Sequence, residues 1–260
     1  MDNPIGIVSC HLTFDTIDEA YDKVMAFGFD AVEWFERRDL FFSDEHRATE
    51  IRETSERLGI GNSYHAFYYD EWDLGRQDPA GAAAVLRRQI TTAANLGADP
   101  MTIHLGSYDP NTGRDETMRR VVEAIEQAAF AAEEKSIVIA VENFTLCHGE
   151  FFLGDRTEDF DLLFGEVSSP AVGLNLDIGH ANITGNLEEL LTRFGDRLRN
   201  IHLHDTDGKT DGHAPPGEGT VDWPGLLDAL KSIPYTGPIN LEFHEKHGKF
   251  AECIAMIRSA

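Results

Sequence analysis

Short runs of β-branched and apolar residues alternate along the chain with longer segments in which apolar residues recur every three to four positions. The short runs predict strands that are buried on both faces, as in a parallel sheet. The segment after Arg114 is the clearest of the helical type, because Met118, Val121, Val122 and Ile125 form one apolar stripe. We predict strands at Ile5–Cys10, Asp30–Phe35, Gly61–His65, Met101–Leu105, Ile137–Glu142, Val172–Asp177, Asn200–His204 and Pro238–Glu242.

Residues that favour helix ends stand between these strands. Thr16 with Glu19, and Asn186 with Glu189, have the spacing of capping boxes. Pro79 follows an aspartate, which is typical of the first position of a helix. Glycines that favour helix termination occur at Gly28, Gly59, Gly97 and Gly195.

This order of elements predicts one α/β fold. Eight strand–helix units share 260 residues, which leaves about 32 residues for each, the size of a βα unit in a closed barrel. We therefore expect a single (β/α)8 TIM-barrel domain over residues 1–260, with a doubly wound open sheet as the alternative. The Gly-rich segment 205–219 is long for a connection between a strand and a helix, which indicates a functional loop.

The formal net charge of −24, from 46 acidic and 22 basic residues, narrows the choice of partners. An acidic coat of this kind is typical of a halophilic protein in a salt-rich cytoplasm. It makes a nucleic-acid partner unlikely on physical grounds, since phosphate binding depends on clustered Lys and Arg. The sequence leaves the oligomeric state open, a homo-oligomer included.

Cysteine content and hydropathy favour a cytoplasmic location. Cys10, Cys147 and Cys253 are widely separated and odd in number, which argues against a disulfide framework and for a reducing compartment. No apolar run approaches the roughly 20 residues of a membrane span. The first residues have no basic region followed by an apolar stretch, so we expect no secretory signal.

The predicted strands end in residues that bind metal ions, and in a (β/α)8 barrel these ends face the active site. Imidazoles and carboxylates together suit zinc, manganese, cobalt or iron. Four of them come from consecutive strands and would repel one another without a cation, so we expect Glu142, Asp177, His202 and Glu242 to hold one divalent ion. The same rim and its loops carry His65, His104, His180, Asp211 and His213.

Five segments stand out at the predicted strand ends and in the loop after the seventh strand. They are Thr102-Ile103-His104-Leu105-Gly106, Val141-Glu142-Asn143, Leu176-Asp177-Ile178-Gly179-His180, Ile201-His202-Leu203-His204-Asp205, and Asp211-Gly212-His213 with Gly217-Glu218-Gly219. Together they resemble the xylose-isomerase-like barrel superfamily, which joins sugar isomerases and epimerases with endonuclease IV-type abasic-site nucleases. Resemblance to the isomerase and epimerase branch implies a small sugar or sugar-like ketone as substrate and an enediolate intermediate. It implies Mn2+ or Zn2+ as cofactor, with Co2+ or Mg2+ as further candidates, and Glu142 and Glu242 as catalytic acid and base.

Substrate contacts are expected from His180, His65 and His104, from Trp34 as an aromatic floor, and from Lys209. The related epimerases carry an Arg after the strand-seven histidine, and here Lys209 stands nearby instead. We also expect His204 and Asp205 to orient His202. Arg37 and Arg38, after the second strand, are candidates for holding a sugar phosphate.

The alternative function is an abasic-site nuclease. Its three-zinc site would use the four central ligands together with secondary metal ligands at His65, His104, His180, Asp211 and His213. The loop after the third strand, which includes Asp70 and Glu71, is acidic where DNA would pass, and Phe144-Thr145 replaces the Gly-rich run of the nucleases. These departures favour sugar chemistry.

Overall fold

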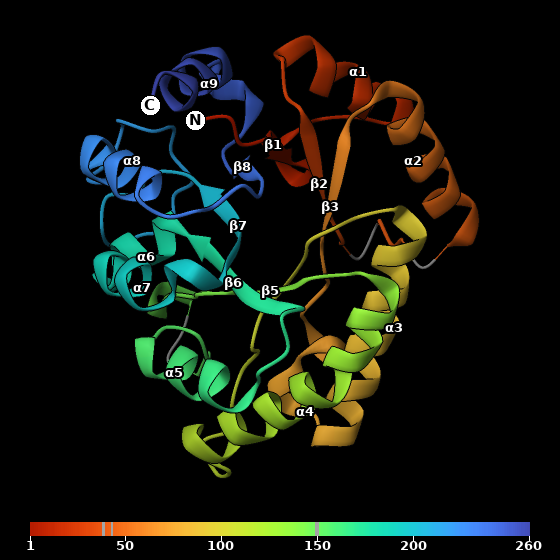
Figure 1. Cartoon of the computed structure of the whole chain (residues 1–260), viewed down its shortest axis with the longest axis vertical. Helices are drawn as coiled ribbons and strands as arrows, with labels where there is room; N and C mark the ends of the chain where they lie inside the picture. The colour runs from red at the N-terminus through yellow and green to blue at the C-terminus, as the bar shows by residue number, and fades with distance from the viewer. Residues whose placement is uncertain (38–39, 43, 149–150) are drawn as a thin grey trace.

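Eight parallel strands close into a barrel in the computed structural model, which describes residues 1–37, 40–42, 44–148 and 151–260 (Figure 1). The strands pair in sequence order, and β1 pairs with β8 to close the ring. This closure excludes the open sheet and confirms the (β/α)8 prediction. The strands are β1 Ile5–Val8, β2 Ala31–Phe35, β3 Gly61–His65, β4 Met101–Ile103, β5 Ile139–Glu142, β6 Val172–Asp177, β7 Leu198–Leu203 and β8 Ile239–Leu241.

Helices surround the barrel, and the two longest, α3 and α4, lie side by side (Figure 1). Among the residues that the structure describes, none of these helices combines the length and apolar character that crossing a bilayer demands. Their bounds are α1 Ile17–Phe27, α2 Glu45–Leu58, α3 Pro79–Leu96, α4 Arg114–Lys135, α5 Thr157–Glu166, α6 Ile178–Thr184, α7 Leu187–Phe194, α8 Trp223–Lys231 and α9 Phe250–Ser259.

All eight predicted strands exist, and several bounds differ from the predictions by one or two residues. At the carboxyl ends the chain leaves the sheet earlier than its apolar pattern suggests. Cys10 lies in a short 3-10 helix, Ser9–His11, and His104 and Glu242 directly follow β4 and β8. These three residues therefore lie just outside the strands, at the rim where the active site of such barrels lies.

The helix-end predictions hold in part. The Thr16 hydroxyl accepts a hydrogen bond from the Glu19 amide at 3.2 Å and so caps α1. Pro79 occupies the first turn of α3. Three of the four predicted terminal glycines adopt the left-handed conformation, and they are Gly28, Gly59 and Gly97.

The capping box at Asn186 is wrong. The Asn186 side chain makes no capping hydrogen bond to α7. The Glu189 carboxylate instead accepts from the Thr157 hydroxyl at 3.1 Å and from Arg193 at 2.8 Å. It therefore bonds to α5 and to the next turn of α7, and not to the start of α7. Gly195 follows α7 but keeps a right-handed φ of −58°, because a 3-10 turn continues from it.

The inside of the barrel is polar near its centre. Glu33, Asn200 and Asn240 are fully buried there and hydrogen-bond to one another. Gly6 on β1 makes room for them, because a Cβ at this position would lie 2.0 Å from the Asn240 side-chain oxygen. The apolar core lies instead between the outer faces of the strands and the helices.

Candidate metal centre and cavity

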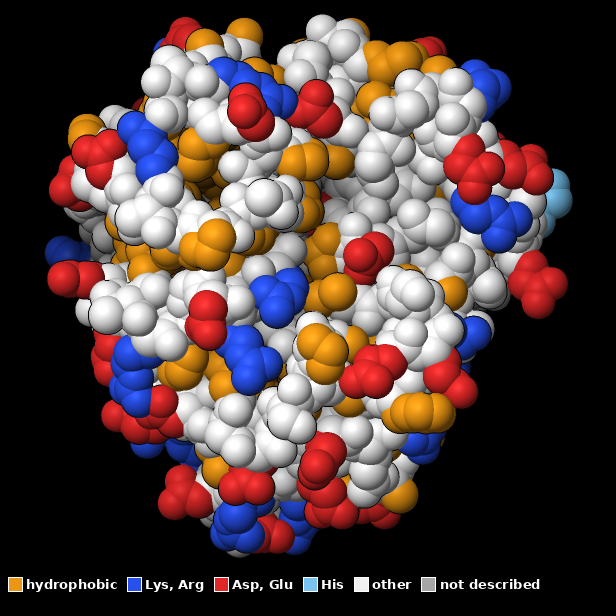
Figure 2. All heavy atoms as spheres, viewed as in Figure 1, with side chains coloured by type: hydrophobic (Ala, Val, Ile, Leu, Met, Phe, Trp, Pro, Cys, Tyr) orange, Lys and Arg blue, Asp and Glu red, His pale blue; other side chains and the backbone are white. Residues whose placement is uncertain are grey.

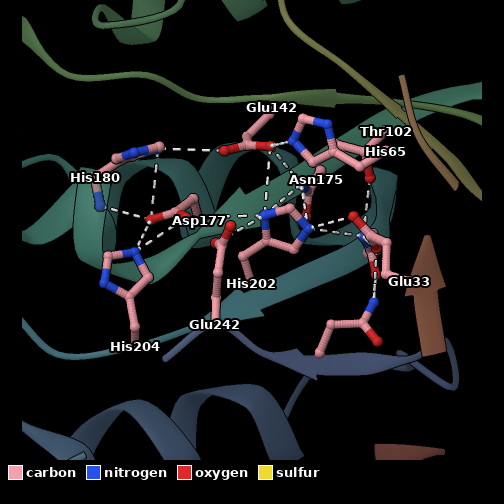
Figure 3. Close-up of polar contacts among 12 residues, drawn as sticks. Glu33, His65, Thr102, Glu142, Asn175, Asp177, His180, His202, His204 and Glu242 are labelled. Atoms are coloured by element: carbon pink, nitrogen blue, oxygen red, sulfur yellow. Dashed lines mark hydrogen bonds and ion pairs between the residues drawn. The ribbon is translucent and has the colours of Figure 1, made fainter. Parts of the chain in front are cut away.

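The four predicted central ligands converge at the carboxyl ends of β5 to β8 (Figure 3). Nδ1 of His202 lies 3.4 Å from Oε2 of Glu142, 3.9 Å from Oδ2 of Asp177 and 3.2 Å from Oε2 of Glu242. All four side chains are buried. The barrel therefore places three carboxylates around one imidazole nitrogen.

This donor set fits a divalent cation. Ligand atoms about 2.0–2.2 Å from one ion stand roughly 3.0–3.5 Å apart, and the separations around His202 are close to this. Oε2 of Glu242 is buried and accepts no hydrogen bond from the described residues. Three oxygens and one nitrogen suit manganese or zinc, and a cation would offset the repulsion among the buried carboxylates.

The buried carboxylates and imidazoles of this site shift one another's pKa values. Burial alone would lower the pKa of His202, but the carboxylates of Glu242, Glu33 and Glu142 hold it well above its ordinary value. Burial would raise the pKa of Glu142, but the imidazoles of His104 and His202 hold it well below its ordinary value. A bound cation would take over the role that the proton on His202 has in stabilising this cluster.

The secondary ligands form two further groups beside the central one. In the first, Oε2 of Glu142 lies 3.4 Å from Nε2 of His65 and 3.7 Å from Nε2 of His104. Burial lowers the pKa of His104 to about 3, so its ring is neutral and able to bind a metal ion.

The second group gathers around Asp211. Its Oδ2 lies 3.4 Å from Nε2 of His180, 3.3 Å from Nε2 of His213 and 2.8 Å from Nε2 of His148. The sequence analysis indicated Asp211, His180 and His213 but not His148. No local pattern marks His148, because its partner lies 63 positions away.

These groups line a cavity of about 330 Å³ at the mouth of the barrel. Six of its lining residues are histidines and five are aromatic. Within the described parts of the chain, no Lys or Arg side chain lines it. The lining residues are Cys10, His11, Phe35, His65, Tyr68, Tyr69, His104, Glu142, Phe144, His148, Phe152, His180, Asp211, His213 and Glu242.

Comparison with known proteins decides the family. A family model described as the xylose isomerase-like TIM barrel matches residues 21–260. The chain belongs to this family. Over 250 residues it is 26% identical to an uncharacterised protein of Methanocaldococcus jannaschii, covering 93% of this chain and 84% of that protein. Over 236 residues it is 28% identical to a D-psicose 3-epimerase of Enterocloster bolteae, covering 85% of this chain and 74% of that enzyme.

A solved structure of a D-tagatose 3-epimerase-like protein shares the fold, with a TM-score of 0.83, 21% identity and 98% of both chains covered. The resemblance to the xylose-isomerase-like superfamily seen in the sequence is therefore confirmed.

Two expected substrate contacts of this xylose isomerase-like barrel lie away from the cavity. Trp34 points outward from β2, where its indole donates to Asn62 at 3.2 Å and packs edge-on against Tyr21. Lys209 is exposed on the loop after β7 and is not among the cavity residues. The structure does not bring either side chain to the predicted metal ligands, and Arg38 lies outside the described residues.

The expected partners of His202 are also different. Nε2 of His204 lies 3.1 Å from Oδ1 of Asp177, so His204 orients that carboxylate and not His202. Asp205 accepts from the Gly217 amide and the Trp223 indole, both at 2.8 Å, and so fixes the loop after β7. The residue that does hold His202 is Glu33 on β2, which the sequence analysis did not single out.

Proposed function

We propose that the protein is a divalent-metal-dependent isomerase or epimerase of a small sugar or sugar-like ketone, acting through an enediolate. Manganese or zinc is the proposed ion, held by Glu142, Asp177, His202 and Glu242. When bound, the ion would supply Lewis-acid polarisation of the substrate's carbonyl and neighbouring hydroxyl. The relatives named as sugar epimerases support this class of reaction.

The observation that carries the proposal is the placement of two carboxylates beside one imidazole. Glu142 and Glu242 reach His202 from different strands, and both also line the cavity (Figure 3). One glutamate can remove the proton next to the carbonyl, and the other can return a proton to the enediolate from another side. Such a pair provides both proton transfers of an epimerisation.

The cavity supports an uncharged sugar as substrate. Its volume of about 330 Å³ accommodates a molecule of the size of a hexose. The rings of Phe35, Tyr68 and Phe144 provide apolar walls, and His180 provides a polar nitrogen for a hydroxyl group. The lining contains carboxylates and, among the described residues, no Lys or Arg side chain that would hold a phosphate.

Solvent exchange tests the proposal. The protein loaded with Mn2+ or Zn2+ is incubated in D2O with D-fructose, D-psicose and L-ribulose. We expect deuterium at the carbon next to the carbonyl and a new sugar epimer or isomer, because the abstracted proton exchanges before it is returned. Absence of both exchange and product with these ketoses would count against the reaction.

The nuclease alternative has its own support, because contacts shorter than 4 Å join all nine candidate ligands into one cluster. We expect one tightly held ion per chain after dialysis, with the His65 and Asp211 groups binding more weakly. Elemental analysis that finds three zinc ions per chain, together with cleavage of an abasic DNA duplex, would favour the nuclease instead. The same duplex without an abasic site serves as the control.

A further inference from the structure

Glu33 is a fully buried carboxylate inside the barrel, beside the ring of His202 and on the side away from Glu142 and Glu242 (Figure 3). Its two oxygens have different partners. Oε2 accepts from the amide nitrogens of Asn200 at 2.7 Å and Asn240 at 2.8 Å, and from the Ser63 hydroxyl at 3.1 Å. Oε1 lies 2.8 Å from Nε2 of His202. A carboxylate has only acceptors to offer, so Nε2 of His202 must be the donor.

The other ring nitrogen of His202 faces the metal ligands. Nδ1 lies 3.2 Å from Oε2 of Glu242 and 3.4 Å from Oε2 of Glu142, on the opposite side of the ring from Glu33. A histidine can bind a metal ion only through a nitrogen that carries no proton. With the proton held on Nε2 by Glu33, Nδ1 is the nitrogen left for the ion.

The neighbouring amides do not make this choice. The Asn175 amide nitrogen is 3.3 Å from both ring nitrogens of His202 and so favours neither. The Asn200 amide nitrogen is 3.4 Å from Nε2, but its hydrogens go to Glu33 and to Thr102, at 2.7 and 3.0 Å. Glu33 is therefore the group that distinguishes Nε2 from Nδ1.

We propose that Glu33 is a positioning residue that fixes the ring orientation and tautomer of His202, so that Nδ1 points at the metal ion. This inference rests on the metal site of the proposed function. Glu33 is not among the residues that line the cavity. It acts through His202, as carboxylates behind metal-bound imidazoles do.

The network predicts an unusual effect for Glu33→Gln. Asn200 and Asn240 both donate to the Oε2 position, so the amide oxygen of glutamine must take that place. The amide NH2 group then faces Nε2 of His202, which has to become an acceptor. The proton moves to Nδ1, where it blocks the metal ion. We expect Zn2+ affinity to fall by about 10–100-fold, the usual range for losing such a partner.

Two further variants distinguish a role of Glu33 in positioning His202 from a role in stabilising the fold alone. Ser63→Ala removes one bond to Oε2 and leaves the contact with His202 intact, so Zn2+ affinity should change by less than about threefold. The double variant Glu33→Gln, Asn200→Asp gives the glutamine amide an acceptor at the Oε2 position and keeps the net charge, and Asn240 can turn its unpaired side-chain oxygen towards the same NH2 group. Its carbonyl can then face His202, and much of the Zn2+ affinity should return.

The experiment measures Zn2+ dissociation constants by competition with a chromophoric chelator, together with melting of each metal-free protein. If Glu33→Gln lowers the melting temperature and leaves the Zn2+ affinity unchanged, Glu33 is only structural and the proposal fails. The unsubstituted protein gives a second test, because 15N NMR of the zinc-loaded form should show the His202 proton on Nε2. A proton on Nδ1 would overturn the proposal. Neither readout uses sugar turnover, so a failure here is distinct from failure of the proposed reaction.

Discussion

Glu242 directly follows β8 and has one carboxylate oxygen that is buried without a hydrogen-bond donor. Glu242→Gln keeps an oxygen for the ion but removes the ability to accept a proton. We expect it to retain much of the bound metal and to lose turnover by about 10²–10⁴-fold, the usual contribution of a positioned general base. Ketose conversion and metal content are measured on the same samples. Normal turnover by this variant would remove Glu242 from the proton-transfer steps.

His180 serves as the comparison for that variant. Its Nδ1 lies 3.0 Å from the Asn143 carbonyl oxygen, and its Nε2 points towards Asp211 at the cavity rim. We propose that it contacts a substrate oxygen, so His180→Asn should raise KM with a smaller loss of kcat than Glu242→Gln. An equal loss of kcat in both variants would place His180 in the chemistry as well.

His104 makes the metal-free protein sensitive to acid. Burial lowers its pKa from 6.5 to about 3 in the folded state. The neutral ring therefore adds stability that is fully present above pH 6.5 and is lost as the pH falls from 6.5 towards 3. His104→Asn should narrow this pH dependence.

The measurement is chemical unfolding of the metal-free protein and of His104→Asn between about pH 7 and about pH 4. As the pH falls, the unfolding free energy of the unsubstituted protein should decrease more than that of His104→Asn, by up to about 1.4 kcal/mol per pH unit. Parallel curves for the two proteins would show that His104 has the same pKa in the folded and unfolded chains, which would contradict the prediction.

At the scale of elements, β6 runs directly into α6, and Asp177 stands at the junction. Its Oδ1 accepts from the His180 amide at 2.6 Å and so caps the helix. Nε2 of His204 lies 3.1 Å from the same oxygen and 3.2 Å from Oδ2. The start of the helix thus fixes Oδ1, His204 holds the whole carboxylate, and Oδ2 also faces Nδ1 of His202 at 3.9 Å.

Gly179 in the first turn of α6 makes this arrangement possible. A Cβ at this position would lie 2.0 Å from the His204 ring. We expect Gly179→Ala to displace His204, loosen Asp177 and weaken metal binding, with a loss of stability of about 1–3 kcal/mol from overpacking. Metal titration and unfolding of the variant check both effects.

Gly165→Ala is the matched control. Gly165 is an exposed helical position in α5 where a Cβ meets no atom within 4 Å. Alanine there should leave metal binding unchanged and raise stability by about 0.4–1 kcal/mol. If both alanine variants behave alike, the packing of His204 on Gly179 does not control the site.

At the scale of the whole molecule, the net charge is −24. On the face shown in Figure 2, Asp and Glu side chains are spread around the periphery and not gathered in one patch. Repulsion among them should destabilise the fold at low ionic strength, and salt should relieve it, because the screening length falls from about 10 Å at 0.1 M to about 3 Å at 1 M. We expect the melting temperature to rise between these KCl concentrations.

A variant with less charge provides the control for this prediction. Replacing the exposed Glu53, Glu56 and Glu134 by Gln changes the net charge by three, from −24 to −21. Its melting temperature should rise less with KCl than that of the unsubstituted protein. A flat or falling curve for the unsubstituted protein would contradict the explanation of the charge as an adaptation to salt.

Several features of the molecule follow from the sequence alone. The alternation of short apolar runs with helical stripes predicted all eight strands, because burial on both faces leaves a mark within a few consecutive residues. The convergence of the four candidate ligands was predicted from their position at strand ends, since parallel strands bring these ends to one rim. Glu142, Asp177 and Glu242 lie where this rule predicts.

Only the tertiary structure decided which side chains meet across the barrel. Side chains alternate along β2, so Glu33 and Phe35 face inward and Trp34 faces the helices. Glu33 and His202 are 169 positions apart, and their contact depends on how the strands tilt and how far each side chain reaches. The local periodicity of the sequence carries information about burial over a few residues. It carries none about which distant residue Glu33 contacts, because the closure of the barrel sets the distance between β2 and β7.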